Sequence, residues 1–329
     1  MDTVISKNPT TQTLKKIVNV CVIGGSGFVG QHIVHLLHAA GYAVRVSTRR
    51  EEHAKELLVL PGVEVLETNI HEPAALAALL SGMDAVINLT GILHERSAKS
   101  GDFQRVHIDL PRRIAQACTA HGVKRILHMS ALNADAQAKS AYLRSKAQGE
   151  AQLRNPFLLV TVFRPSVIFG AEDAFLNQFA ALLRRLPVLA LACGDAKLQP
   201  VYVEDVARAF VSSLEHPETF GRTYALCGPK VYTLQQLVQY VNDLQQRQRW
   251  IMTLGKRASY YQAWLLEKLP GKLMTRDDYY ALLGNSVCGG VFPTVFGFQP
   301  TLLEAVAPQY LGPESMISPY DTWRGQARR

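Results

Sequence analysis

The sequence predicts an α/β fold, a doubly wound parallel sheet followed by a smaller C-terminal lobe. Two observations lead to this prediction. A glycine-rich turn near the N-terminus joins an apolar, β-branched strand to a helix, and continuous apolar strands then alternate with helices as far as Arg164. Strands that are apolar on both faces are typical of parallel sheets with helices on each side. A chain of 329 residues has room for such a sheet and a second, smaller unit.

The first strand is the apolar run 17–23, which stops at the glycine turn. The helix behind it has apolar residues at the 3.6-residue period and ends at Gly41. This order of strand, turn and helix, repeated along the chain, predicts a Rossmann domain over residues 17–165. Later strands are expected at 43–48, 63–68, 84–90, 125–129 and 158–163, and helices at 103–121 and 141–153.

Beyond residue 165 the alternation stops, and proline and glycine become frequent. We expect a smaller α/β lobe over 166–312, formed around a cofactor cleft at the edge of the sheet. Residues 1–16 are expected to be a flexible tail and residues 313–329 a disordered one. Within the lobe, helices are expected at 175–185, 203–215 and 234–246, and a short strand at 224–227.

The net charge of +8 favours an anionic partner, such as a phosphorylated cofactor or an acidic lipid surface. We expect no nucleic acid, because no basic run carries interleaved aromatic residues. The polar start of the chain does not resemble a secretory signal, and no apolar run reaches the ~20 residues of a membrane span. The five cysteines lack a C-x-x-C spacing, so we expect reduced, structural cysteines in a cytoplasmic protein without a metal site.

The turn after the first strand carries glycines at the spacing G-x-x-G-x-x-G. Such a turn exposes backbone N–H groups at a helix N-terminus, where a pyrophosphate can bind. Gly24 allows the tight turn, Gly27 lets the backbone approach the phosphates, and Gly30 lets the helix pack on the strand. An ordinary strand–helix turn is the alternative. The cofactor contacts predicted in this loop are Gly24, Gly25, Ser26, Gly27, Phe28, Val29 and Gly30.

The second predicted strand ends in Ser47, Thr48, Arg49 and Arg50. An NAD-preferring site usually places an acidic residue there to bind the ribose 2′-hydroxyl, whereas hydroxyl and guanidinium groups suit a 2′-phosphate. We therefore predict NADP(H) as the preferred cofactor, bound by Arg49 and Arg50, with NAD(H) as the alternative. The competing interpretation is that both arginines are solvated surface charges.

Tyr142 and Lys146 lie four residues apart and share one face of a predicted helix. A lysine ammonium beside the phenol favours the phenolate, which lowers a pKa near ~10 toward a catalytically useful value. The same lysine can bind the nicotinamide ribose. Ser130, at the end of the fifth strand, can polarise a substrate carbonyl. The predicted catalytic residues are thus Ser130, Tyr142 and Lys146, and Tyr142 and Lys146 are also predicted cofactor contacts.

Residues 247–272 mix basic and aromatic side chains. A basic amphipathic stretch of this kind can lie on an anionic membrane surface or bind a partner protein. The interpretation that the sequence favours is a helix that packs its face of Tyr261, Leu265 and Leu269 on the lobe.

Several segments together resemble one family. They are the runs 129–134 and 142–150, the loop 169–177 with the pattern Phe-Gly-x-Glu-Asp-x-Phe-Leu-Asn, and the triplet 275–277. With the glycine spacing, which is typical of short-chain dehydrogenases/reductases (SDR), they resemble the SDR-like accessory subunit of respiratory complex I (NADH:ubiquinone oxidoreductase, alpha subcomplex) and its bacterial relatives. The resemblance covers residues 18–311.

This family is an atypical or extended SDR branch, similar in fold to NAD-dependent epimerases/dehydratases. The resemblance implies a tightly held NADPH with a structural role, and a link to ubiquinone metabolism. It also implies a protein partner at the respiratory quinone-reducing complex and a peripheral location at the inner face of the respiratory membrane. Asn69 and Ile70 stand where SDR proteins commonly carry an Asp-Leu pair that contacts adenine. The further predicted cofactor contacts are Asn69, Ile70, Leu89, Thr90, Gly91 and Pro165.

The sequence departs from the SDR pattern at two places. His107 stands where many SDR enzymes have an asparagine, and Ser130 is followed by Ala131 where many relatives have a second serine. Both departures weaken the case for an efficient proton relay, and both leave cofactor binding untouched.

Two functions therefore compete. In the first, the protein holds NADP(H) mainly as a structural cofactor and is an accessory subunit or assembly partner with little turnover. In the second, it is an active NADP(H)-dependent oxidoreductase or epimerase/dehydratase on a small or lipophilic carbonyl compound, such as a quinone-pathway intermediate, and uses Tyr142 and Lys146. A redox sensor that binds NADP(H) is a weaker third hypothesis.

Overall fold

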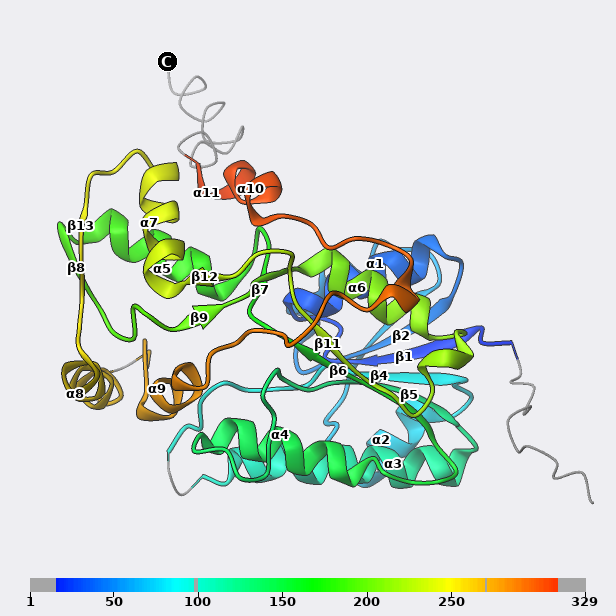
Figure 1. Ribbon diagram of the computed structural model, residues 1–329. Helices are drawn as coiled ribbons and strands as arrows, with labels where there is room; N and C mark the ends of the chain where they lie inside the picture. The colour runs from blue at the N-terminus through cyan, green and yellow to red at the C-terminus, as the bar shows by residue number, and fades with distance from the viewer. Residues whose placement is uncertain (1–15, 98–99, 270, 313–329) are drawn as a thin grey trace, which may run out of the picture.

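The computed structural model describes residues 16–97, 100–269 and 271–312. The tails expected at 1–16 and 313–329 lie outside the described residues, apart from Lys16. Helices enclose one large sheet, and a second group of helices and short strands projects from one end of it (Figure 1). Among the described residues, no helix is both long and apolar enough to cross a membrane.

The large sheet has seven parallel strands in the order β11-β6-β5-β4-β1-β2-β3. The interior strand β1, between β4 and β2, buries both faces, because Val20 and Val22 lie in one hydrophobic cluster and Cys21 and Ile23 in another. A continuous apolar run is what such a strand requires. The strands are β1 (Asn19–Ile23), β2 (Ala43–Thr48), β3 (Val63–Glu67), β4 (Ala85–Asn88), β5 (Arg125–Met129), β6 (Leu159–Pro165) and β11 (Thr223–Leu226).

The predicted strands of the first domain are confirmed, and those at 43–48 and 125–129 have the predicted bounds. The strand expected at 224–227 was placed in the smaller lobe, but it belongs to the large sheet. It is β11, which pairs in parallel with β6 and forms an outer strand of the large sheet.

Helices cover both faces of the sheet (Figure 1). One face carries α1 (Phe28–Ala39) and α6 (Val203–Ser213), which pack on each other. The other face carries α2 (Pro73–Leu80), α3 (Leu110–His121) and α4 (Ala141–Gln152).

The helix expected at 103–121 begins with a π-helical segment, Gln104–Asp109, and is α-helical only from Leu110. The Leu110 N–H donates to the Arg105 carbonyl, five residues back. Pro111 has no N–H to donate to the His107 carbonyl, which permits this wider turn.

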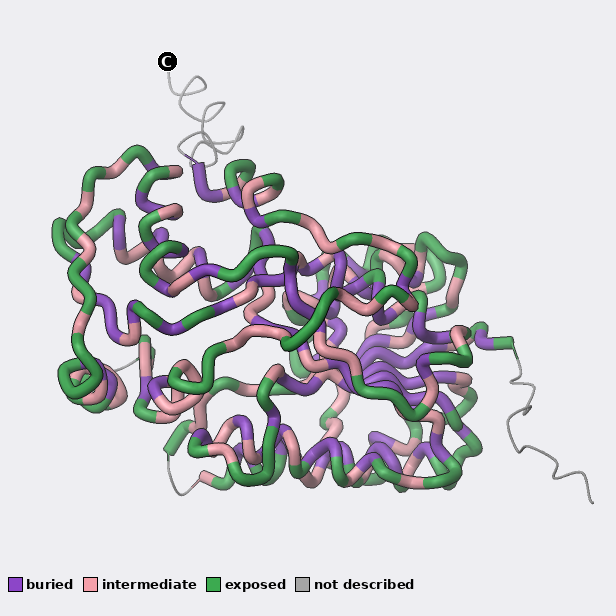
Figure 2. The backbone as a smooth tube through the Cα atoms, viewed as in Figure 1, coloured by how far each residue is buried: buried purple, intermediate pink, exposed green. Residues whose placement is uncertain are grey.

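The second group of elements has its own core, built mainly by α5 (Ala174–Arg185) and α7 (Leu234–Leu244). Figure 2 shows buried stretches in these helices that are separate from those of the large sheet. The other elements are the strand pairs β7 (Ile168–Phe169) with β10 (Val201–Tyr202), β9 (Lys197–Leu198) with β12 (Tyr232–Thr233) and β8 (Val188–Leu191) with β13 (Trp250–Thr253), and the helices α8 (Lys256–Leu266), α9 (Arg276–Leu283), α10 (Leu303–Val306) and α11 (Pro308–Leu311).

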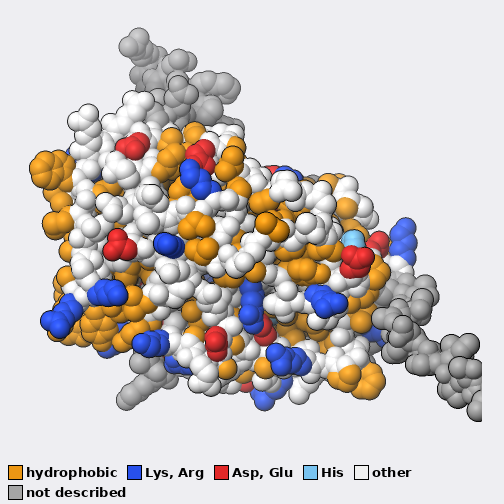
Figure 3. All heavy atoms as spheres, viewed as in Figure 1, with side chains coloured by type: hydrophobic (Ala, Val, Ile, Leu, Met, Phe, Trp, Pro, Cys, Tyr) orange, Lys and Arg blue, Asp and Glu red, His pale blue; other side chains and the backbone are white. Residues whose placement is uncertain are grey.

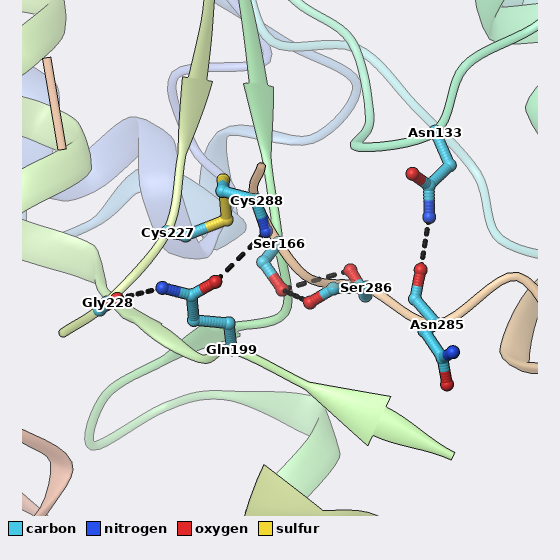
Figure 4. The surroundings of a disulfide bond; sticks show 8 residues. All are labelled: Asn133, Ser166, Gln199, Cys227, Gly228, Asn285, Ser286 and Cys288. Carbon is cyan, nitrogen blue, oxygen red and sulfur yellow. Dashed lines mark hydrogen bonds between the residues drawn. A yellow bond between two sulfur atoms is a disulfide. The ribbon is translucent and has the colours of Figure 1, made fainter. Parts of the chain in front are cut away.

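A disulfide joins Cys227, directly after β11, to Cys288 in the segment that returns from α9 toward the large sheet (Figure 4). Their Cα atoms are 6.1 Å apart, although the residues are 61 positions apart in the chain. The expectation that every cysteine is reduced is therefore wrong for this pair. The spacing gave no sign of it, because only the return of the folded chain brings the two residues together.

Hydrogen bonds fix the same returning segment beside the disulfide (Figure 4). The Ser166 hydroxyl, just beyond β6, donates to the Ser286 carbonyl at 2.8 Å. The Gln199 side chain donates to the Gly228 carbonyl at 2.6 Å and accepts from the Cys288 N–H at 3.0 Å. The segment 285–288 is thus attached to the carboxyl ends of β6 and β11.

Candidate functional site

The glycine turn between β1 and α1 leaves its backbone open on one side. Gly24 has a φ of +84°, a left-handed conformation that glycine adopts without strain. A Cβ at Gly25 would lie 2.8 Å from Val46 Cγ1, and one at Gly30 would lie 2.6 Å from Gly25 Cα, so packing requires both glycines. A Cβ at Gly27 would meet only the Gly24 carbonyl, at 3.4 Å. Packing therefore does not explain Gly27, whose open side fits the close approach of a ligand.

The start of α1 is also suited to an anion. No side chain of the described residues caps its first turn, which begins at Phe28 behind Gly27. Its first N–H groups are therefore open to hydrogen-bond acceptors, and the helix dipole favours negative charge there.

The two arginines after β2 are exposed and have different surroundings. Neither forms an ion pair with another described residue. Arg50 borders an open pocket together with Glu51, Glu52, Lys55, Leu58 and Glu67. The three carboxylates of this pocket disfavour a phosphate beside Arg50, which leaves Arg49 as the better placed of the two.

Two further predicted contacts lie at strand ends. Asn69, after β3, is exposed, and its Oδ1 accepts from the His71 N–H at 3.2 Å, so the side chain fixes the local turn. Ile70 beside it is half-buried. Pro165, at the end of β6, is buried, and its carbonyl accepts from the Leu132 N–H at 2.9 Å.

The loop after β4 approaches Lys146. Buried Asn88 accepts from the Thr90 N–H at 3.2 Å and from the Thr90 hydroxyl at 2.7 Å, while its amide nitrogen lies 3.1 Å from His128 Nδ1. A Cβ at Gly91 would lie 3.6 Å from Lys146 Nζ. The fold thus brings the predicted loop 89–91 to the predicted lysine. Asn88 and His128, which hold this loop, carry no motif and were missed from the sequence.

Lys146 is buried on α4, and its Nζ donates to the Met129 carbonyl at 2.8 Å. Burial lowers the pKa of Lys146 to about 8. Burial also raises the pKa of Tyr142 to about 12, and the negative charge of Asp278 adds to that shift. The expectation that Lys146 lowers the pKa of Tyr142 is therefore wrong: burial and the charge of Asp278 raise that pKa, while the Lys146 ammonium donates to a backbone carbonyl.

Ser130 lies next to Met129 and is only 3% exposed. Its N–H donates to the Phe163 carbonyl at 2.7 Å, but its hydroxyl has no hydrogen-bond partner among the described residues. An unpaired buried hydroxyl costs about 1–3 kcal/mol. The site therefore fits a ligand group that completes the hydrogen bonding of Ser130.

His107 lies in the π-helical segment and contacts Tyr142 ring to ring, with centroids 5.6 Å apart. The Ser145 hydroxyl donates to the Tyr142 carbonyl, so His107 Nδ1 must donate to Ser145, 2.7 Å away. His107 Nε2 accepts from the Ile92 N–H at 3.1 Å. Burial and Lys146 lower the pKa of His107 to about 3. His107 is thus a neutral residue whose two ring nitrogens both form hydrogen bonds. This fits the expectation that histidine at this position weakens the case for a proton relay.

The predicted site residues meet at one edge of the sheet. The glycine turn follows β1, the arginines follow β2, Asn69 follows β3, Leu89 follows β4, and Ser130 follows β5. Because the strands are parallel, their carboxyl ends share an edge, which is where open parallel sheets bind ligands. The described residues include no group of three or more His, Cys, Asp or Glu placed to hold a metal ion.

The described residues between 247 and 272 include β13 and α8, and the packing predicted for the α8 face is wrong. Tyr261, Leu265 and Leu269 are 68%, 57% and 48% exposed. The helix contacts the lobe through the small residues Ser259 and Ala263, which are buried. These small side chains let α8 lie close to the lobe and leave the bulky face outward.

We call the outward face the α8 surface. In addition to Tyr261 and Leu265, it includes Trp264 on the same helix and the basic residues Arg257 and Lys268 at helical spacing. Lys268 Nζ lies 3.6 Å from the centre of the Trp264 ring. Figure 3 shows hydrophobic and basic side chains close together at the lower left, where Figure 1 draws α8.

The profile of the NAD dependent epimerase/dehydratase family matches residues 20–227. The NADH dehydrogenase (ubiquinone) 1 alpha subcomplex subunit 9 of Mus musculus is 36% identical over 232 residues, which are 69% of this chain and 61% of that protein. The NADH-ubiquinone oxidoreductase 40 kDa subunit of Neurospora crassa is 31% identical over 261 residues, 78% of this chain and 68% of that protein. The match to the mouse protein thus spans less than two thirds of its length.

A ceramide reductase of Caulobacter vibrioides is 31% identical over 198 residues, 60% of this chain and 61% of that protein. Among solved structures, the UDP-N-acetylglucosamine 4-epimerase of Methanobrevibacter ruminantium has the same fold, with a TM-score of 0.69 at 18% identity over 93% of this chain and 100% of that one. Together with the family match, these findings show that the chain belongs to the NAD dependent epimerase/dehydratase family.

Proposed function

We propose that this protein binds NADP(H) at the carboxyl edge of the sheet and holds it mainly as a structural cofactor, as a subunit or assembly partner of the respiratory quinone-reducing complex. The observation that carries the proposal is the state of the Tyr142 and Lys146 pair. The Lys146 ammonium already donates to the Met129 carbonyl at 2.8 Å, and burial and the charge of Asp278 raise the pKa of the Tyr142 phenol to about 12. Such a site can retain a ligand but is poorly suited to moving a proton. The names of the mouse and Neurospora relatives support the respiratory setting.

Each part of the nucleotide has a candidate partner. The turn 24–30 and the start of α1 would bind the pyrophosphate, and Arg49 would bind the 2′-phosphate. The loop 89–91 would lie along the ribose, and Tyr142 and Lys146 would bind the nicotinamide ribose. The bound group supplies hydride chemistry, whereas these residues bind and orient it.

The test is the identity and behaviour of the nucleotide that purifies with the protein. We expect NADP(H), identified by mass spectrometry after acid extraction, to exchange slowly with labelled NADPH and to remain reduced when a ubiquinone analogue is added. Purification of NAD(H) alone, or the absence of binding by either nucleotide in a titration, would overturn the proposal.

The second candidate function is an active NADP(H)-dependent reductase of a lipophilic carbonyl compound. The Caulobacter relative, by its name a ceramide reductase, and the presence of Ser130, Tyr142 and Lys146 together favour it. The substitution Tyr142→Phe distinguishes the two functions. If the protein oxidises NADPH with a quinone or a long-chain ketone, and Tyr142→Phe abolishes that turnover, the reductase replaces the accessory role. If Tyr142→Phe leaves slow background oxidation unchanged, the accessory role stands.

We further propose that the α8 surface attaches the protein to the anionic inner face of the respiratory membrane. Outward aromatic side chains flanked by lysine and arginine are the pattern of interfacial helices. The exposure of Tyr261 and Leu265, which the sequence had led us to place against the lobe, is the observation that favours it.

A further inference from the structure

The N-terminus of α4, the helix that carries Tyr142 and Lys146, is capped by a residue from a distant part of the chain. Asp277 Oδ1 accepts from the Ala141 N–H at 2.6 Å, and its Oδ2 accepts from the Tyr142 N–H at 3.0 Å. The Ser140 hydroxyl also donates to Asp277, at 2.8 Å, and accepts from the Leu143 N–H at 3.3 Å. Asp277 and Ser140 together satisfy the first three N–H groups of α4, which a helix start otherwise leaves open.

Asp277 does not serve the helix on which it lies. The start of α9 has its own capping box, in which Thr275 accepts from the Asp278 N–H and Asp278 accepts from the Thr275 N–H. Arg276 between them pairs with Glu267 at 2.8 Å. The Asp277 carboxylate is therefore available to α4, and it lies at the N-termini of two helices, where both dipoles favour its negative charge.

The other half of α4 has a separate attachment. Glu150, one turn beyond Lys146, forms a two-bond ion pair with Arg164 of β6, at 2.8 and 2.6 Å. Gly149 allows close contact with the π-helical segment, because a Cβ there would collide with the His107 carbonyl. The sheet thus fixes the end of α4, while its beginning, with Tyr142, is fixed by α9.

We propose that Asp277 is a positioning residue that sets Tyr142 and Lys146 against the nicotinamide half of the bound nucleotide. The inference rests on the proposed function. The Asp277 carboxylate binds the backbone N–H of Tyr142 itself, so its loss moves that residue first. The Ser140 cap remains when Asp277 is replaced, so α4 still begins at the same place and the change is local.

The test compares two ligands that share the adenine half. NADPH reaches both the glycine turn and α4, whereas adenosine 2′,5′-bisphosphate lacks the nicotinamide half. For Asp277→Ala we expect NADPH to bind about tenfold more weakly, with the emission of the bound nicotinamide shifted toward that of free NADPH. Adenosine 2′,5′-bisphosphate should bind as it does to the unchanged protein. Asp277→Asn keeps one acceptor oxygen and loses the charge, so its affinity for NADPH should lie between those of the unchanged protein and Asp277→Ala.

The matched control is Asp243→Ala, which removes an exposed carboxylate of α7 that, among the described residues, accepts a hydrogen bond from the Gln239 side chain alone. It should leave both affinities unchanged. If Asp277→Ala weakens both ligands equally, or neither, the positioning role is wrong. If the unchanged protein binds neither ligand, the proposed function fails and this inference fails with it, so the two failures are distinguishable. Should Asp277→Ala not fold, Asp277→Asn carries the same comparison.

Discussion

Arg49 and Arg50 are neighbours in the sequence, yet the structure gives them different prospects as phosphate ligands. Arg50 lies among Glu51, Glu52 and Glu67. Arg49 instead lies near His71, after β3, whose pKa is lowered mainly by burial and also by nearby arginines that include Arg49. A charge-assisted hydrogen bond contributes ~1.5–3 kcal/mol, which is roughly ten- to hundredfold in affinity. We therefore expect Arg49→Ala to weaken NADPH binding by that factor and to leave NADH binding nearly unchanged, as measured by calorimetric titration.

Arg50→Ala is the control for this prediction, because it removes the same charge from an acidic surrounding and should have a smaller effect on NADPH. An equal loss of NADPH and NADH affinity in Arg49→Ala would contradict the assignment of the 2′-phosphate to Arg49.

Single residues also show which parts of the site a sequence can reveal. The glycine turn, the arginine pair and the Tyr142/Lys146 pair are local patterns, so each can be read within a few positions. Asn88 and Asp277 act on partners that are remote in the chain, 40 residues away for His128 and 136 for Ala141. The pKa of Tyr142 could not be predicted either, because it depends on burial and on Asp278 rather than on Lys146 alone.

At the scale of a single element, α8 presents the surface that we propose to lie on an anionic membrane. A basic side chain near such a surface contributes ~1 kcal/mol. Replacing Arg257 and Lys268 of this surface, together with the exposed Lys256 at the start of α8, by glutamine should therefore weaken binding to vesicles that contain phosphatidylglycerol by more than about a hundredfold. Flotation of the protein with these vesicles, and with phosphatidylcholine vesicles for comparison, measures the effect.

A matched variant replaces three exposed basic residues at the opposite, amino edge of the sheet, Lys124, Arg154 and Arg222, by glutamine. It has the same net charge as the α8 variant and should still float. If the α8 variant floats as well as the unchanged protein, the surface does not bind membranes through its charge.

The same element shows where sequence patterns mislead. The strands of the large sheet were predictable because both faces of the sheet are buried, with Val46 in one hydrophobic cluster and Ile126 in another, which produces continuous apolar runs. In α8 the apolar periodicity was real, but it marks the exposed side, while the buried contact uses Ser259 and Ala263. Strand pairs two residues long, such as β7 with β10, have no pattern that a sequence could display.

On the scale of the whole molecule, one covalent bond joins the large sheet to the segment that returns from the lobe. The bond between Cys227 and Cys288 closes a loop with a sequence separation of 61 residues. On the chain-entropy account, a cross-link of that span stabilises the fold by about 4 kcal/mol. The same link holds the segment 285–288, whose Ser286 binds Ser166 at the end of β6.

Replacing both Cys227 and Cys288 by serine should therefore lower the free energy of unfolding by about 2–4 kcal/mol in urea titrations. A reducing agent should bring the unchanged protein to the same midpoint and leave the double variant where it is, because the variant has no bond to lose. Cys193→Ser, which changes a half-buried cysteine outside the disulfide, should keep the response to the reductant. If reduction shifts the double variant as much as the unchanged protein, the stabilisation does not come from this bond, and the attachment of the returning segment must come from its hydrogen bonds alone.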